Sequence, residues 1–272
     1  MAKFNKSHDT NSTEVSSLNS AGIDVDAFVE KRALLGTNTR VRGGARLSGY
    51  VKTGKNAFID SNAIILGPVS IGTGTYIGPN CVVGHPNSAE LMKLQSSSLL
   101  PVKGKTAIGK HCTVRSGTVI YSGVKIGDHV TFGHNVMVRE NVTVGNRTKL
   151  GTNVAIDGRS TIGSHVSVQT GVYICTYSTV EDSVFLGPCC VFTNDKYVSQ
   201  KKFRLVGPTV RRGASVGANA LLFPGIIVGE GALVGSQAMV NRDVPPRTIY
   251  GGVPATKMRD VPKSWRSSLL HR

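Results

Sequence analysis

Two side chains in the middle of the sequence could accept a proton at neutral pH. His134 follows the dipeptide Phe-Gly, and Glu140 follows Arg139. Histidine is a common general base near pH 7, so we consider His134 a candidate base and Glu140 a candidate to orient or receive the proton. The structural alternatives are an interfacial hydrogen bond for His134 and a salt bridge between Glu140 and Arg139.

A second group of side chains is suited to binding phosphate. The chain has six basic residues and no acidic one between positions 196 and 212: Lys196, Lys201, Lys202, Arg204, Arg211 and Arg212. Arginine can hold a phosphate through two parallel hydrogen bonds, so an anionic ligand is one prediction for this stretch. The alternative is basic residues that only face solvent. Lys257, Arg259 and Lys263 near the C-terminus extend the same prediction.

A repeat of six residues supplies the scaffold for these side chains. From Ile108 to Phe192 every sixth residue is apolar, and a small residue follows four positions after each. The period returns from Val210 to Val234 and begins, less regularly, at Val41. A period of six fits neither an α-helix nor a long alternating strand, but it fits short strands joined by tight turns, the pattern of a parallel β-helix.

The repeat also defines the organisation of the chain. Three strands complete a coil of about 18 residues, and coils stack at roughly 4.8 Å. We therefore predict an all-β fold with a β-helix of about ten coils over residues 41–245, interrupted by loops at 84–107 and 193–209. Residues 1–40 are expected to form a polar tail or cap, with one helical candidate near residues 24–35. Residues 246–272 are expected to form a basic cap that contains a short helix. A short helix is also predicted within the first loop, near residues 89–94.

The positions of the cysteines and the absence of long apolar runs indicate where in the cell the protein is located. Cys81, Cys112 and Cys190 occupy the small inward position of their hexads, so we expect reduced thiols in the core. No apolar run approaches the roughly 20 residues that cross a bilayer, and the first 20 residues are polar, so a cytoplasmic location without membrane contact is expected.

Several segments together resemble the left-handed β-helix acyltransferases. These are the hexads, the loop Phe-Thr-Asn-Asp-Lys-Tyr at 192–197, the run at 213–220 and the ending Gly-Val-Pro-Ala at 252–255. The resemblance covers residues 41–260 and is greatest to N-acetyltransferases of nucleotide-linked 3-amino sugars or uronates. That group commonly has proline after the tyrosine of the loop, where this chain has Val198.

The resemblance implies a left-handed β-helix and a homotrimer, with acetyl-CoA in the groove between adjacent prisms. The implied reaction is N-acetylation of a nucleotide-activated amino sugar in the synthesis of cell-surface glycans. Acetyl-CoA is then expected to contact these residues: Arg211, Arg212, Gly217, Ala218, Gly235, Ser236, Lys257 and Arg259.

The resemblance also assigns a role to the loop at 193–209. In related O-acetyltransferases a histidine of this loop deprotonates a sugar hydroxyl, and the matching residue here is Asn194, which cannot act as a base. This favours an amine acceptor. The catalytic candidates are His134, Asn194 and Glu140, and the sugar is expected to contact Asn194, Asp195, Lys196, Tyr197 and Arg139. The alternative is that Asn194 and Asp195 only form a turn. Spacing by 18 places Glu140 and Asn194 on one edge, three coils or about 14 Å apart.

Other functions remain open. The γ-type carbonic anhydrases share this prism and bind zinc through outward histidines, and His129 and His134 have their five-residue separation. Their positions within the hexads differ, and zinc needs three converging ligands, so no metal is expected. A column of His111, His129, Arg147 and His165 is expected at one corner as a solvated stack.

The net charge of +16, from 32 basic and 16 acidic residues, raises the possibility of nucleic-acid binding. An aromatic content of 6% and the absence of a nucleic-acid motif argue against it. O-acetyl or other acyl transfer and a non-catalytic phosphate-binding scaffold are the further alternatives.

Overall fold

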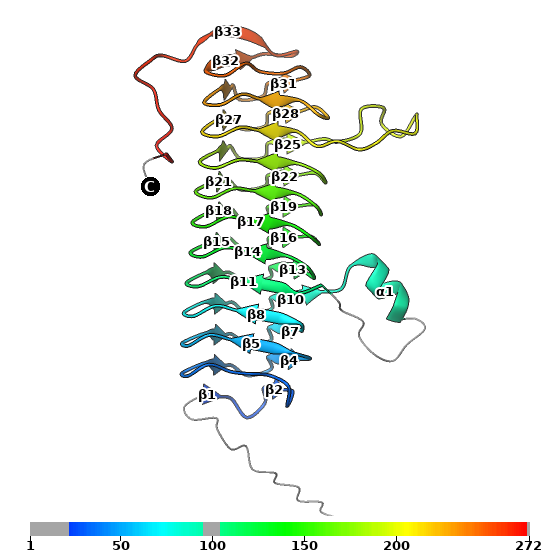
Figure 1. Ribbon diagram of the computed structural model, residues 1–272, viewed down its shortest axis with the longest axis vertical. Coiled ribbons are helices and arrows are strands. Elements are labelled where there is room, and N and C mark those ends of the chain that lie inside the picture. The colour runs from blue at the N-terminus through cyan, green and yellow to red at the C-terminus, as the bar shows by residue number, and fades with distance from the viewer. Residues whose placement is uncertain (1–21, 95–103, 271–272) are drawn as a thin grey trace, which may run out of the picture.

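The computed structural model describes residues 22–94 and 104–270 and shows a tall, three-sided β-helix (Figure 1). Its strands form sheets of 13, 11 and 9 strands, which we call sheets I, II and III. Most strands are two residues long, and in all of these except β1 and β2 the second residue is buried, as the hexad pattern requires. The architecture confirms the parallel β-helix that the six-residue period predicts.

The strand bounds follow the hexads along the chain. Sheet I contains β1 (Gly22–Ile23), β3 (Arg40–Val41), β6 (Phe58–Ile59), β9 (Tyr76–Ile77), β12 (Thr113–Val114), β15 (Thr131–Phe132), β18 (Lys149–Leu150), β21 (Ser167–Val168), β24 (Phe185–Leu186), β27 (Ser215–Val216), β30 (Leu233–Val234), β32 (Thr248–Gly251) and β33 (Thr256–Asp260). Sheet II contains β2 (Phe28–Val29), β4 (Arg46–Ser48), β7 (Ile64–Leu66), β10 (Val82–His85), β13 (Val119–Tyr121), β16 (Met137–Val138), β19 (Ala155–Ile156), β22 (Tyr173–Ile174), β25 (Val191–Phe192), β28 (Leu221–Leu222) and β31 (Met239–Val240). Sheet III contains β5 (Val51–Thr53), β8 (Val69–Ile71), β11 (Thr106–Ile108), β14 (Lys125–Ile126), β17 (Thr143–Val144), β20 (Thr161–Ile162), β23 (Thr179–Val180), β26 (Thr209–Val210) and β29 (Ile227–Val228).

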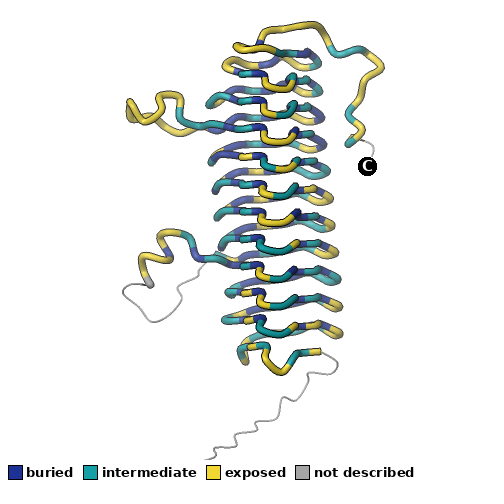
Figure 2. Tube along the Cα trace, turned by 180° about the vertical axis from the view of Figure 1, so that it is seen from behind, coloured by how far each residue is buried: buried dark blue, intermediate teal, exposed yellow. Residues whose placement is uncertain are grey.

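The core is a set of columns of inward side chains. Val138 pairs with Ile156, and Ile156 pairs with Ile174, so each inward residue stacks on the one 18 positions away. Figure 2 shows the buried positions recurring in the coils that follow the first one. Most core residues are Val, Ile, Leu and Ala, and Phe132 and Phe192 are the largest fully buried side chains. An interior this narrow excludes most aromatic residues, which explains their scarcity in the sequence.

Each coil bends at three corners, where one residue often takes a left-handed backbone. Asn135 has φ 54° and Asn153 has φ 56°. Asparagine tolerates this conformation better than most residues because its short polar side chain can bond locally. We name the corners after the sheets that they join: the I–II corner includes His134, the II–III corner includes Glu140, and the III–I corner includes His129.

The N-terminal part of the β-helix begins earlier than expected. β1 pairs in parallel with β3, and β2 with β4, so residues 22–40 contribute a coil instead of a tail. The helical candidate at residues 24–35 is wrong, because Phe28 and Val29 continue the strand pattern. Twelve parallel strands in sheet I therefore replace the expected ten or so coils. Residues 1–21 of the predicted tail lie outside the described residues.

The C-terminal part also differs from its prediction. β33 turns back antiparallel to β32, and residues 261–270 continue as an arm along the side of the β-helix (Figure 1). The short helix expected in this cap is absent from residues 246–270. By contrast, α1 (Ser88–Leu94) confirms the helix predicted in the first loop. No helix in the described part of the chain has the length and apolar character needed to span a membrane.

The cysteines follow the inward pattern. Cys81, Cys112 and Cys190 are buried as predicted, Cys175 is buried too, and Cys189 is exposed. Burial raises the pKa of Cys81 to about 11 and that of Cys190 to about 12. The buried thiols are therefore protonated and shielded, so they react poorly.

This arrangement predicts the thiol chemistry of the native protein. A thiol-specific chromogenic disulfide reagent should label one cysteine per chain quickly in buffer and all five after unfolding in guanidinium. Cys189→Ser should lose the fast phase. A second fast thiol in the native wild type would contradict the packing of the core.

Candidate functional site

Both interruptions of the repeat leave the β-helix at the same corner. The first joins β10 to β11 and the second joins β25 to β26, so both connect sheet II to sheet III. Figure 1 shows the two excursions projecting from one side of the prism. Sheet II has four further strands between β10 and β25, so the loops flank a strip of its outer surface at the II–III corner.

A polar cluster occupies this strip. Arg139 donates hydrogen bonds of 3.2 and 3.1 Å to the two carboxylate oxygens of Glu140, and it lies 4.0 Å from Asp157. The guanidinium also lies over the Tyr121 ring, 5.7 Å from its centroid. Tyr173 donates a 2.6 Å hydrogen bond to Asp157. Burial and this hydrogen bond raise the pKa of Tyr173, so the phenol remains a hydrogen-bond donor at neutral pH.

Glu140 therefore forms an ion pair with Arg139. Both of its oxygens face Arg139, which matches the structural alternative for this residue. The expected edge is present: Asn194 donates a 3.2 Å hydrogen bond to the Thr176 carbonyl, and Gly158 lies against Glu140. Glu140 and Asn194 thus occupy one corner, three coils apart.

Asp195 organises the second loop. Its carboxylate accepts backbone hydrogen bonds from Tyr197 at 2.9 Å and Ser199 at 2.7 Å. These bonds hold the pKa of Asp195 below its usual value. Tyr197 contacts the edge of Phe203, with ring centroids 5.3 Å apart, and Lys201 lies over its ring. Lys196 is exposed on the same loop. Contacts among the residues of the loop therefore stabilise its conformation.

Val198 gives this loop a strained bend. Its φ of 48° lies in the left-handed region, which is unfavourable for a β-branched residue, and Ser199 follows with φ 62°. Proline has a fixed φ near −65°, so it cannot adopt this conformation. A loop with proline at this position must therefore have a different backbone conformation from the one that Val198 adopts here.

His134 lies at the I–II corner, on the other edge of sheet II. It occupies the turn between β15 and β16 and not a strand. The imidazole Nδ1 lies 2.8 Å from Ser116 Oγ, and the side chain is exposed. A hydroxyl bonded to Nδ1 fixes the ring and leaves Nε2 available for another partner.

The catalytic candidates do not converge within one chain. His134 lies at the I–II corner, whereas Glu140 and Asn194 lie at the II–III corner. His129 lies at the III–I corner, so it does not join His134 at a zinc site. In the described residues no group of three or more His, Cys, Asp and Glu side chains is arranged to hold a metal ion. The predicted histidine column is present, with the His111 and His129 rings stacked at 5.1 Å.

The residues expected to contact acetyl-CoA are divided between two corners and β33. Gly217 and Gly235 belong to I–II turns, and a Cβ at Gly217 would lie 2.4 Å from the Ser236 nitrogen, so tight coil stacking already requires that glycine. Ala218 and Ser236 follow them in the same turns. Arg211 is paired with Glu181, at 2.5 Å.

The two candidates on β33 are also engaged. Lys257 lies 2.7 Å from Asp260, which raises the pKa of the lysine. The Arg259 guanidinium lies over the Trp265 ring at 5.6 Å.

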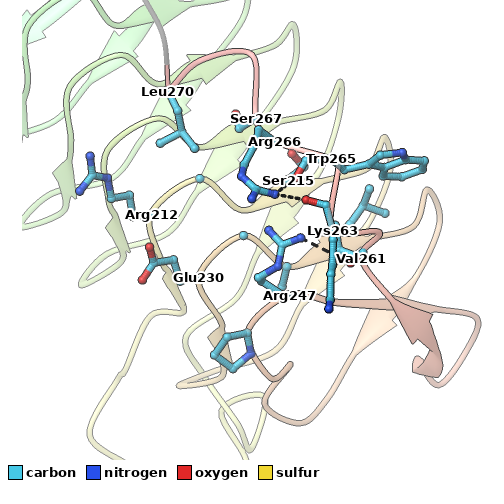
Figure 3. Close-up of a pocket in the computed structure, with 15 residues that line it drawn as sticks. Arg212, Ser215, Glu230, Arg247, Val261, Lys263, Trp265, Arg266, Ser267 and Leu270 are labelled. Carbon is cyan, nitrogen blue, oxygen red and sulfur yellow. Dashed lines mark hydrogen bonds between the residues drawn. The ribbon is translucent and has the colours of Figure 1, made fainter.

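Arg212 lines the cavity beneath the C-terminal arm, whereas Arg211 lines a separate one. Figure 3 shows Arg212 beside Glu230, on the opposite side of the cavity from Lys263 and Arg266 of the C-terminal arm, with Arg247 between them. The cavity has a volume of about 660 Å³. Sequence reasoning missed Arg247 and Arg266, because no repeat or spacing relates the arm to the coils that it crosses.

The geometry agrees with a known repeat. The family described as bacterial transferase hexapeptide (six repeats) matches residues 50–85, 105–140 and 123–158. Bacterial transferase hexapeptide repeats therefore occur in these segments of the chain. The match confirms the repeat on which the expected family rests, and it covers strands from all three sheets of the β-helix.

Individual relatives match the chain over short segments. Chloramphenicol acetyltransferase from Escherichia coli is 50% identical over 44 residues, which are 16% of this chain and 21% of that protein. The bifunctional protein GlmU from Rubrobacter xylanophilus is 38% identical over 72 residues, 26% of this chain and 15% of that protein. The chain thus spans only about a fifth of the length of these relatives.

A solved structure is similar over more of the chain. UDP-N-acetylglucosamine acyltransferase from Campylobacter jejuni has a TM-score of 0.48 and 18% identity, covering 86% of this chain and 73% of that chain.

The bond between Ser116 and His134 predicts that the imidazole orientation depends on the Ser116 hydroxyl. Ser116→Ala should change the ¹⁵N chemical shift of His134 Nδ1, because a net hydrogen bond of about 1 kcal/mol favours the bonded orientation about fivefold. Ser116→Thr should restore the shift. Unchanged shifts in Ser116→Ala would show that the bond does not form in solution.

The left-handed bend at Val198 predicts the stability of the second loop. Val198→Asn should stabilise the folded loop by about 1 kcal/mol, and Val198→Pro should open it. The loop contains Lys196, Lys201 and Lys202, so tryptic cleavage within it should be slower in the first variant and faster in the second. Val206→Asn, outside the left-handed region, should give no protection.

Proposed function

We propose that the protein is an acetyl-CoA-dependent N-acetyltransferase that acts on a nucleotide-activated amino sugar in cell-surface glycan synthesis. The observation that carries the proposal is the exposed His134, whose ring is oriented by Ser116, together with a loop that has Asn194 and no histidine. Acetyltransferases among the sequence relatives support the reaction class. The activated sugar and its 3-amino group come from the resemblance of the loop at 192–197.

In the proposed reaction the sugar amine attacks the carbonyl carbon of the acetyl thioester. The C–N bond forms and the C–S bond breaks, while the amine gives a proton to His134 Nε2 and the CoA thiolate leaves and is then protonated. A free amine is already nucleophilic, so the base is required only to remove the proton as the bond forms. This chemistry suits a site in which the loop supplies an amide and not a second base.

The separation of the candidates supports a homotrimer as part of the proposal. His134 and the second loop occupy different corners of one prism, so a second copy of the chain is needed to bring a loop opposite a histidine. Rotation by a third of a turn closes such a ring of three-sided prisms. Arg139 then lines the acceptor side, where its ion pair with Glu140 fixes the guanidinium.

The proposal predicts a specific loss of activity. Release of the CoA thiol from acetyl-CoA should depend on a nucleotide-linked amino sugar, and His134→Ala should lower kcat by about 10² to 10⁴. His165→Ala is the matched control, because His165 is another partly exposed corner histidine on the III–I side and should retain activity.

Two outcomes would contradict the proposal. Full activity in His134→Ala would remove the base assignment. No turnover of acetyl-CoA with any UDP-, dTDP- or GDP-linked amino sugar would reject the N-acetyltransferase function.

A further inference from the structure

The III–I corner loses its side chains over two successive coils near the C-terminal end. Lower coils present these residues at the left-handed position: His111, His129, Arg147, His165 and Ser183. The next two positions are Gly213 (φ 66°) and Gly231 (φ 60°), and the column resumes at Arg247 (φ 52°). Other coils show that larger residues adopt this backbone, so glycine is not required there by conformation alone. Its effect is to leave a recess in the corner.

The C-terminal arm crosses this recess and roofs it. The Val261 amide donates a 2.8 Å hydrogen bond to the Arg247 carbonyl. Ser267 Oγ donates to the Ser183 carbonyl at 3.3 Å, and Leu270 lies against Gly213. The arm is thus fixed above and below the two glycine positions, and the space that remains is the cavity of about 660 Å³ (Figure 3).

Four cationic side chains and one carboxylate line the cavity: Arg212, Arg247, Lys263, Arg266 and Glu230. Among the described residues none of the four cations forms a salt bridge. Arg247 donates to the Val261 and Pro262 carbonyls, and Arg266 donates to the Lys263 and Trp265 carbonyls. Neutral carbonyls orient these guanidiniums without cancelling their charge. The cavity therefore has a formal excess of three positive charges, which favours an anion.

Two further groups narrow the class of anion. Glu230 stands beside Arg212, and a carboxylate in an anion site repels an inorganic polyanion but accepts hydrogen bonds from sugar hydroxyls. Trp265 stands on the arm at the edge of the cavity, 47% exposed, with one contact to the Arg259 guanidinium. An exposed indole offers a surface on which a planar base can stack.

We infer that the recess beneath the C-terminal arm binds a nucleoside phosphate. Arg212, Lys263 and Arg266 bind the phosphate groups, and Glu230 accepts hydrogen bonds from the ribose. The two sources of such a group in the proposed reaction are the adenosine 3′,5′-bisphosphate end of CoA and the nucleotide of the sugar donor. The choice between these sources rests on the proposed function, whereas the nucleotide site itself does not.

Trp265 is the only tryptophan in the chain, so intrinsic fluorescence reports on this cavity. Titration of the full-length protein with adenosine 3′,5′-bisphosphate, UDP and pyrophosphate should give a saturable change with at least one nucleotide. Arg212→Gln should raise its Kd about tenfold or more, because a charge-assisted hydrogen bond is lost. Lys110→Gln, which removes an exposed charge five coils below on the same corner, should leave the Kd unchanged.

A second variant fills the recess without removing a charge. Gly231→Asn is compatible with the left-handed backbone, and its Cβ would lie at an ordinary 3.6 Å from Arg247 Cγ. It should abolish the fluorescence response while thermal unfolding stays cooperative.

The outcomes separate the site from the enzyme function. Tighter binding of adenosine 3′,5′-bisphosphate identifies CoA as the source, and tighter binding of UDP identifies the sugar nucleotide. Pyrophosphate binding as tightly as both nucleotides, or nucleotide binding unaffected by Arg212→Gln and Gly231→Asn, would overturn the inference. Nucleotide binding without acetyl transfer would reject only the enzyme function, and acetyl transfer without a fluorescence response would reject only the site.

Discussion

In-register stacking at intervals of 18 residues is the constraint on which the rest of this structure depends. Backbone hydrogen bonds join each coil to the next, as between the Gly127 amide and the Val144 carbonyl at 2.8 Å. Side chains reinforce the ladder at the III–I corner: the amides of Lys110, Asp128, Asn146 and Ser164 each donate to the side chain 18 residues later. An insertion inside a strand would break this register for every column, so additional chain is accommodated only where a strand has ended.

This constraint determines where chemistry can be located. The two-residue strands offer few outward positions, and the inward ones are closed by close packing. Functional side chains are therefore found at corners, in the two loops and in the arm beyond the last coil. The polar cluster around Arg139 lies at outward positions next to the II–III corner. The His134 ring lies in a turn. The cationic cavity lies where two successive turns have glycine and therefore no side chain.

The parts of the fold that depend on the period could be predicted from the sequence. The inward cysteines, the histidine column and the shared edge of Glu140 and Asn194 all follow from counting by 6 and 18. Other features depend on contacts between distant segments. The hydrogen bond from Ser267 to Ser183 and the position of Arg247 under the arm have no signature in the repeat. The first coil was missed because residues 24–35 also suit a helix, although Ile23, Val29 and Leu35 continue the six-residue period back from Val41.

The antiparallel strand β33 has a consequence for growth of the β-helix. A stack of parallel strands ends in a row of unpaired backbone groups that can template another chain. β33 covers sheet I at the C-terminal end, runs opposite to the repeat, and places Lys257, Arg259 and Asp260 on its exposed surface. A second β-helix cannot continue the parallel ladder across such a charged, reversed strand. The reversal at β33 thus blocks parallel extension of sheet I at this end of the β-helix.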